Sequence, residues 1–168
     1  MGANLNMFSF PYCRKHNLAT ITIGNDVTIY NRLVENLAGI SHATVLAAVM
    51  PGARLIIGNH VGMSGVILFS CCEIIIEDYV NLGVGVLVYD TDHHPVDYMA
   101  RRIHDISRIN TRPVRICKDA FIGAHVIVLK GVTIGERSIV AAGSIVTRDI
   151  PSDCIAAGSP AKVVKMIG

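Results

Sequence analysis

Residues 116–151 read ICKDAF IGAHVI VLKGVT IGERSI VAAGSI VTRDIP, six hexapeptides that follow one another without a gap and each open with Ile or Val. A period of six matches neither the 3.6-residue repeat of a helix nor the alternation of an ordinary strand. It is typical of a parallel β-helix, in which short strands stack and the aliphatic openers fill a continuous core. The fifth positions are small or aliphatic, namely Ala120, Val126, Val132, Ser138, Ser144 and Ile150. The sequence therefore predicts an all-β fold.

The same period recurs upstream of these hexapeptides. Residues 23–27 form an early copy, and the later openers are Ile57, Met63, Ile76, Leu82 and Val88. Between Met63 and Ile76 the phase slips by one residue, which we interpret as a bulge or a loose corner.

Two stretches interrupt the repeat. Residues 89–115 are polar, charged and rich in histidine, and they are too long for a passive connection, so they predict a protruding loop with a function. Residues 30–51 are also irregular, and their conformation stays open. The expected organisation is one domain over 1–168, with an irregular N-terminal part at 1–52, coils at 53–88 and 114–166, and the protruding loop at 89–113.

Composition indicates a compact domain that acts away from membranes and nucleic acids. Of the 168 residues, 51% are hydrophobic, enough to fill a sizeable core. The chain contains no apolar run of the roughly 18 residues that a membrane-spanning helix needs. Residues 1–18 lack the pattern of a signal peptide, so we expect a cytoplasmic protein. The formal charge of +2 comes without an Arg/Lys stripe, which argues against nucleic-acid binding.

The five cysteines include the vicinal pair Cys71 and Cys72 but no CxxC or Cys/His spacing. We therefore expect them to pack as small hydrophobic residues in a reducing compartment.

The strings DTDHHPVD at 90–97 and IGAHVIVLKGVTIGERSIVAAGSIVTRDIPSDCIAAGSPAKVV at 122–164 resemble the hexapeptide-repeat O-acetyltransferases. This family includes maltose and galactoside acetyltransferases and the enzymes that acetylate capsular and O-antigen polysaccharides. The resemblance covers about residues 53–166, and GNHVGMSG at 58–65 is closer to the polysaccharide branch. It implies a left-handed β-helix with coils of about 18 residues, a homotrimer, and acetyl-CoA in the groove between neighbouring subunits. The handedness comes from the family, because crossovers are otherwise right-handed.

Transfer of an acetyl group to a hydroxyl needs a base that takes the hydroxyl proton, and a histidine suits this near neutral pH. The resemblance assigns this role to the histidine before the proline, His94, with Pro95 stiffening the turn. His93 is the rival. The cysteines lie at coil positions, so we expect direct attack without an acyl-enzyme.

The resemblance also implies binding residues. For acetyl-CoA these are small residues along the pantetheine arm and polar or basic residues near the nucleotide, in total Ala124, Ala142, Gly143, Thr147, Arg148, Lys162 and Lys165. The last four are expected to gather at one corner. Candidates for binding the acceptor are Ser64, Asp92, His93 and Asp97. Three positions depart from the family pattern, with Phe121 in place of Trp, Cys117 in place of Gly and Lys162 in place of Arg.

The expected function is acetylation of a sugar hydroxyl on a glycan or its precursor. N-acetylation of an amino-sugar nucleotide, acetylation of an antibiotic and a non-catalytic scaffold remain alternatives. A zinc-dependent carbonic anhydrase of this fold would need two histidines five residues apart. None of the seven histidines forms such a pair, so no metal is expected.

Overall fold

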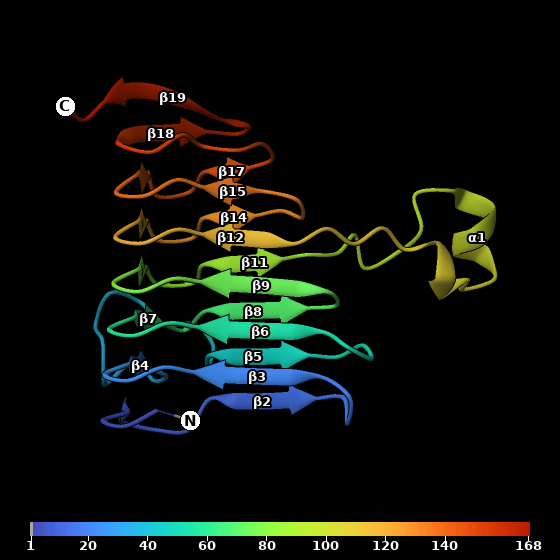
Figure 1. The fold of residues 1–168 in the computed structure, drawn as a ribbon, viewed down its shortest axis with the longest axis horizontal. Helices are drawn as coiled ribbons and strands as arrows, with labels where there is room; N and C mark the ends of the chain where they lie inside the picture. The colour runs from blue at the N-terminus through green and yellow to red at the C-terminus, as the bar shows by residue number, and fades with distance from the viewer. Residues whose placement is uncertain (1) are drawn as a thin grey trace.

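The computed structural model describes residues 2–168 as a parallel β-helix whose coils stack along one axis (Figure 1). Three sheets form the sides of the prism. Sheet A contains β1 (Asn6–Met7), β4 (Thr28–Tyr30), β7 (Gly62–Ser64), β10 (Asn81–Leu82), β13 (Phe121–Ile122), β16 (Ile139–Val140), β18 (Cys154–Gly158) and β19 (Ala161–Met166). Sheet B contains β2 (Tyr12–Lys15), β5 (Val45–Ala48), β8 (Ile67–Ser70), β11 (Leu87–Tyr89), β14 (Ile127–Val128) and β17 (Ile145–Val146). Sheet C contains β3 (Thr20–Ile23), β6 (Arg54–Ile57), β9 (Glu73–Ile76), β12 (Val114–Ile116) and β15 (Thr133–Ile134).

The hexapeptide openers form the core, as the repeat predicts. Each coil runs from sheet C to sheet A to sheet B, and equivalent openers pair in parallel register, for example Ile116 with Ile134 and Ile122 with Val140. The six openers of residues 116–151 are all fully buried, namely Ile116, Ile122, Val128, Ile134, Val140 and Val146. The fifth-position side chains are buried with them. Among the described strands of the three sheets, only β19 departs from the parallel pattern, since it folds back antiparallel on β18.

The corner between sheets C and A, the C/A corner, has the same length in every coil. Each passage covers six residues from one opener to the next, from Ile23–Ile29 at one end to Ile150–Ala156 at the other. The fourth residue of each passage has a positive φ although none is glycine: Asp26, His60, Tyr79, Asp119, Arg137 and Asp153. This conformation turns the chain sharply, and side-chain contacts between stacked positions stabilise it, such as the Arg137–Asp153 ion pair at 2.6 Å.

The slip between Met63 and Ile76 arises from two corners of altered length. Met63 and Leu68 occupy equivalent positions of sheets A and B only five residues apart, whereas Leu82 and Val88 are six apart. Leu68 and Ile76 are then eight apart, because strands β8 and β9 are longer than those of the later coils. The interpretation of a changed corner is thus confirmed, with one residue lost at the A/B corner and two gained at the B/C corner.

The helix begins much earlier than the sequence predicted. The assignment of residues 1–52 as irregular is wrong, because β1 to β5 already belong to the three sheets. Within residues 30–51, β5 pairs with β2 and β8, and residues 31–44 and 49–51 lack strand structure. These strands were missed because β2 is exposed throughout and because residues 31–44 separate β4 from β5.

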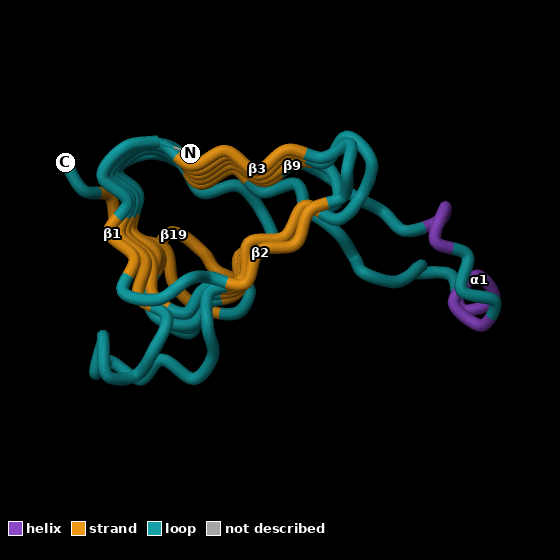
Figure 2. Tube along the Cα trace, turned by 90° about the horizontal axis from the view of Figure 1, so that it is seen from below, coloured by secondary structure: helices purple, strands orange, loops and turns teal. Residues whose placement is uncertain are grey.

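Two segments project from the prism when it is viewed along its axis (Figure 2). Residues 31–44 leave the A/B corner. The larger projection is the expected loop at 89–113, which leaves the B/C corner and carries α1 (Tyr98–Arg102) and the short 3₁₀ helix η1 (Ile106–Arg108). No helix among residues 2–168 is long and apolar enough to cross a membrane.

Candidate active site

The loop at 89–113 stands on a stalk in which its two arms run antiparallel. Thr91 and Thr111 form a β-bridge, and the Asp92 N–H donates to the Asn110 carbonyl at 3.0 Å. At the base, the Arg112 N–H donates to the Asp90 carbonyl at 2.9 Å. Backbone bonds of this kind give the loop a defined position relative to the coils.

The buried carboxylate of Asp90 joins this stalk to the coil below. It accepts hydrogen bonds from the Cys71 and Cys72 N–H groups at 2.7 and 2.8 Å and from the Ser70 hydroxyl at 2.8 Å. A buried carboxylate is stable only when its oxygens are satisfied in this way. Asp90 therefore holds the start of the loop against the B/C corner.

Two of the acceptor candidates have structural partners within the loop. Asp92 pairs with Lys130 at 2.5 Å and ties the stalk to the turn after β14. The Asp97 carboxylate accepts a hydrogen bond from the Ala100 N–H at 2.8 Å, which caps α1, and it lies 3.7 Å from Arg108. Both side chains thus stabilise the loop, and their role in acceptor binding stays a prediction.

The adjacent histidines have different surroundings. His93 has a positive φ of 59°, and its ring packs against Phe69 at 4.9 Å and edge-on against Tyr89 at 4.8 Å between ring centroids. Burial lowers the pKa of His93, and the neighbouring His94 lowers it further. His94 is exposed, and its backbone N–H donates to the Asp92 carbonyl at 2.7 Å. Both residues are exposed, but the His93 ring packs against Phe69 and Tyr89 on the outer face of sheet B, whereas no aromatic partner of His94 is found among residues 2–168.

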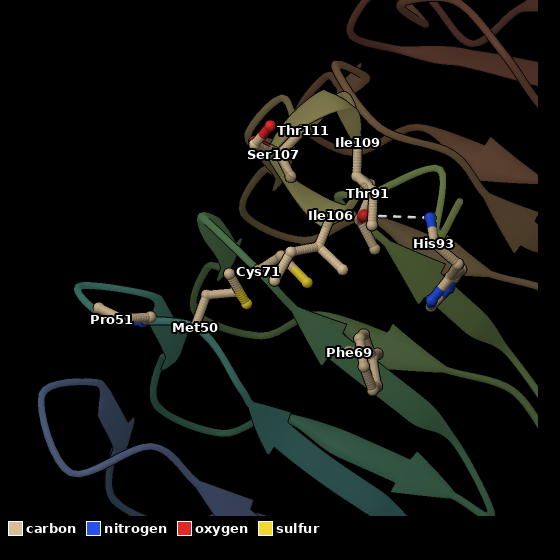
Figure 3. Close-up of a pocket in the computed structure, with 10 residues that line it drawn as sticks. All are labelled: Met50, Pro51, Phe69, Cys71, Thr91, His93, Ile106, Ser107, Ile109 and Thr111. Atoms are coloured by element: carbon tan, nitrogen blue, oxygen red, sulfur yellow. Dashed lines mark hydrogen bonds between the residues drawn. The ribbon is translucent and has the colours of Figure 1, made fainter. Parts of the chain in front are cut away.

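A pocket of about 530 Å³, which we call the apolar pocket, opens between the loop and the B/C corner of the lower coils (Figure 3). Side chains from Met50, Cys71 and Ile106 converge in it, with His93 on the side of Phe69. Its lining consists of Met50, Pro51, Phe69, Cys71, Thr91, His93, Ile106, Ser107, Ile109 and Thr111. The volume is in the range of small-molecule sites.

A second, polar pocket of about 640 Å³, which we call the basic pocket, lies on the other side of the same stalk. Arg112, Lys130 and Thr147 line it, and it shares Ile109 and Thr111 with the apolar pocket. Thr147 belongs to the residues expected at the nucleotide end of acetyl-CoA. Arg148 follows it, one coil above Lys130.

The structure does not gather the four polar and basic tail residues at one corner of a single chain, so that expectation is wrong. Thr147 and Arg148 follow β17 at the B/C corner, whereas Lys162 and Lys165 lie on β19 at the edge of sheet A. The tail folds back on β18 instead of continuing the coil, which places its lysines on another face of the prism.

The small residues assigned to the pantetheine arm do form one column. Ala124, Ala142 and Gly143 lie at the A/B corner, where the Gly143 N–H donates to the Ala124 carbonyl at 2.8 Å. Gly143 has a φ of 73°, and a side chain at neighbouring Gly123 would come within 2.6 Å of the Ala142 nitrogen. Close packing of the coils therefore requires glycine at position 123, whereas at Gly143 a Cβ would meet no atom within 4 Å and only the positive φ favours glycine.

Ser64 lies at the A/B corner and not at the base of the histidine loop. Its hydroxyl accepts a hydrogen bond from Asn36 of the 31–44 segment at 3.0 Å, and the residue is buried. Within one chain, Ser64 and His94 thus belong to different corners.

The vicinal thiols at the B/C corner are poor nucleophiles. Burial, followed by the charge of Asp90, raises the pKa of Cys72 to about 11 and also raises the pKa of Cys71. Cys71 and Cys72 are half-buried, Cys154 is buried and Cys13 is exposed, so the expectation of packed cysteines holds only in part.

We expect iodoacetamide at pH 7.5 to modify Cys72 far more slowly than free cysteine, because a raised pKa leaves little thiolate at that pH. The rate should climb as the pH approaches 11, which mass spectrometry of quenched samples can follow. Rapid modification of Cys72 at pH 7.5 would contradict the raised pKa.

Comparison with known proteins identifies the repeat. The family model for the bacterial transferase hexapeptide (six repeats) matches residues 113–148. The chain is a hexapeptide-repeat protein. This hexapeptide-repeat protein is 38% identical to the galactoside O-acetyltransferase of Escherichia coli over 99 residues, which are 55% of this chain and 47% of the relative. It spans about half the length of the curated relatives that it matches.

Solved structures confirm the left-handed β-helical fold of this hexapeptide-repeat protein. A maltose O-acetyltransferase from Clostridium difficile 630 aligns with a TM-score of 0.56 at 25% identity, over 99% of this chain and 71% of the other. A hexapeptide-repeat acetyltransferase from Vibrio cholerae, complexed with acetyl coenzyme A, aligns with a TM-score of 0.61 at 24% identity, over 93% and 71% of the two chains. The similarity to the Vibrio cholerae protein shows the fold alone.

Several residues at the candidate site of this hexapeptide-repeat protein were not predicted from the sequence. Phe69 and Tyr89 are register partners on sheet B, but their rings meet His93 only because the loop folds back. Lys130 could have been found, since it stands 18 residues, or one coil, before Arg148. Among residues 2–168, no group of three or more His, Cys, Asp or Glu side chains could hold a metal ion.

Proposed function

We propose that this protein transfers the acetyl group of acetyl-CoA to a hydroxyl of a sugar or glycan precursor. The observation that carries the proposal is that the His-Pro loop and the stacked cations Lys130 and Arg148 share the B/C corner. A general base and stacked cations at the same corner suit acetyl-CoA, a long acyl donor that carries phosphates. The Escherichia coli galactoside O-acetyltransferase supports a sugar as the acceptor.

Acetyl-CoA would lie along the axis of the prism. Stacked strands are about 4.8 Å apart, so Arg148 stands roughly 10 Å along the axis from the coil that carries the loop. That separation allows the phosphates to contact Arg112 and Arg148 while the thioester lies near the loop. Ala124, Ala142 and Gly143 would line the thin pantetheine arm, and Lys162 and Lys165 would meet the nucleotide from another face.

His94 is the general base in this proposal. Both histidines are exposed, but the His93 ring is packed against Phe69 and Tyr89, which leaves His94 as the histidine better able to turn toward a bound hydroxyl. His94 accepts the hydroxyl proton as the oxygen attacks the thioester carbonyl, the new C–O bond forms, and the C–S bond breaks. The proton then passes to the departing CoA thiolate, so no acyl-enzyme is needed.

The active unit in this proposal is a homotrimer. The outer face of sheet B carries a ladder of half-buried aliphatic side chains, one from each of five consecutive coils: Val45, Ile67, Leu87, Ile127 and Ile145. Sheet C instead carries the ion pairs Arg54–Glu73 and Arg115–Glu77. Association through sheet B would cover the apolar ladder and bring the A/B corner of one subunit toward the loop of another.

Sedimentation should give about three times the mass of one chain, and a stable, fully active monomer would contradict the trimer.

A screen of sugar and amino-sugar acceptors tests the reaction directly. Release of free CoA thiol from acetyl-CoA should depend on the acceptor, and mass spectrometry should find an O-acetyl ester that mild base removes. A base-stable amide would instead identify an amino sugar as the acceptor. Binding of acetyl-CoA without turnover of any acceptor would favour a scaffold over an enzyme.

We expect Arg148→Ala to raise the KM for acetyl-CoA by about 10-fold with little change in kcat, because a phosphate contact far from the carbonyl contributes to binding of substrate and transition state alike. Steady-state kinetics measure both constants. Arg14→Ala, an exposed arginine on the first strand of sheet B, is the matched control. If Arg148→Ala behaves like Arg14→Ala, the phosphate assignment is wrong.

A further inference from the structure

The apolar pocket is lined by His93, the residue that precedes the proposed base, but it offers little to a sugar ring. Its walls include the apolar side chains of Met50, Ile106 and Ile109 and the Phe69 ring. Two of its hydroxyls are already engaged, since Thr91 accepts a hydrogen bond from the His93 N–H at 3.1 Å and Ser107 donates to Asp105 at 2.6 Å. The pocket therefore favours a group that makes few hydrogen bonds.

The apolar pocket is also electrically neutral near pH 7. Its two titratable groups are His93, whose pKa is lowered mainly by burial, and Cys71, whose pKa is raised mainly by burial. Both shifts favour the uncharged forms of these side chains. The nearby carboxylates are engaged elsewhere, Asp90 with the Cys71 and Cys72 backbone and Asp92 with Lys130. An anionic ligand would find no partner there.

The basic pocket on the opposite side of the stalk differs from the apolar pocket in its charge. Arg112 and Lys130 line the basic pocket, where Lys130 is paired with Asp92 and Arg112 supplies the further positive charge, while Ile109 and Thr111 line both pockets. Phosphates of the donor are thus directed to one side of the loop, and uncharged groups are directed to the other.

We infer that the apolar pocket binds an aryl or alkyl group attached to the sugar whose hydroxyl is acetylated. This inference rests on the proposed function and narrows its acceptor class to glycosides with an apolar aglycone. With the apolar group between Phe69 and Ile106, the sugar would extend toward the side of the pocket that His93 lines, next in the chain to the proposed base.

Paired glycosides of one sugar test the inference. The experiment compares the phenyl and methyl glycosides of a sugar that the enzyme acetylates in the acceptor screen. If no sugar is acetylated, the phenyl and methyl β-galactopyranosides are compared. Burial of the phenyl ring should lower the KM by about 10-fold or more relative to the methyl glycoside. Ile106→Gln or Met50→Gln, which place a polar group in opposite walls, should bring the ratio of the two KM values close to one. Ile103→Gln, an exposed isoleucine of the same loop outside the pocket, should leave the ratio unchanged.

Calorimetric binding of the phenyl glycoside without acetyl-CoA separates the two hypotheses. Binding that Ile106→Gln abolishes, together with no turnover of any acceptor, would keep the pocket and overturn the proposed reaction. Equal kcat/KM values for the phenyl and methyl glycosides would keep the reaction and overturn the pocket. If neither glycoside is turned over and the phenyl glycoside does not bind, both proposals are wrong.

Discussion

His94→Ala should lower turnover by about 100-fold to 10,000-fold, the usual contribution of a positioned general base. The KM for acetyl-CoA should change little, because the exposed His94 side chain lies outside the basic pocket. Steady-state release of CoA thiol with a saturating acceptor measures the effect. The wild-type rate should also fall in acid, since only a neutral imidazole accepts the hydroxyl proton.

His93→Phe is the control for this experiment. A phenyl ring can keep the packing against Phe69 and Tyr89 but cannot accept a proton, so turnover should fall far less than in His94→Ala. The opposite order of effects would make His93 the base. Unchanged turnover in both variants would remove the loop histidines from the mechanism.

Ile134→Asp should destabilise the fold by roughly 3–5 kcal/mol, because it would bury an unpaired charge between two coils. Ile134 is fully buried, pairs with Ile116 below it, and bridges to Ile150 above it. The core cluster of the described residues consists of apolar side chains, so the carboxylate would remain unpaired or protonated. Urea unfolding followed by circular dichroism measures the loss.

Two variants separate charge from shape at this position. Ile134→Val removes one methylene and should cost about 1 kcal/mol. Ile103→Asp makes the same chemical change at an exposed loop position and should change stability by about 0.5 kcal/mol or less. A similar loss in Ile134→Asp and Ile103→Asp would show that position 134 is not part of the core.

The period of six residues made the core predictable, since every opener from Ile116 to Val146 is buried where the repeat places it. The N-terminal coils were harder to predict, because β1, β2 and β5 carry few aliphatic openers at regular spacing and an insertion at 31–44 separates β4 from β5. Strand pairing between coils, for example Cys13 with Leu46, is a non-local contact that spacing alone does not show.

The candidate site was predictable where it follows the coils and unpredictable where it depends on the loop. Ala124 and Ala142 stack as their 18-residue separation requires. The packing of His93 on Phe69, the anchoring of the loop by Asp90 and the return of β19 on sheet A all depend on how irregular segments fold back. Such contacts follow from side-chain packing in three dimensions and leave no period in the sequence.

The constant C/A corner has a consequence for how this scaffold can acquire new specificity. Every inserted residue in the described chain lies at the A/B or B/C corner. The C/A corner keeps six residues from one opener to the next, and the fourth of these residues always has a positive φ. A change of length on that edge would shift the register of all later coils, whereas the other two edges already accommodate segments of different size. Exchanging residues 31–44 or 89–113 for segments from related proteins is therefore a practical route to chimeras with altered acceptors. The C/A corner would stay unchanged in such chimeras.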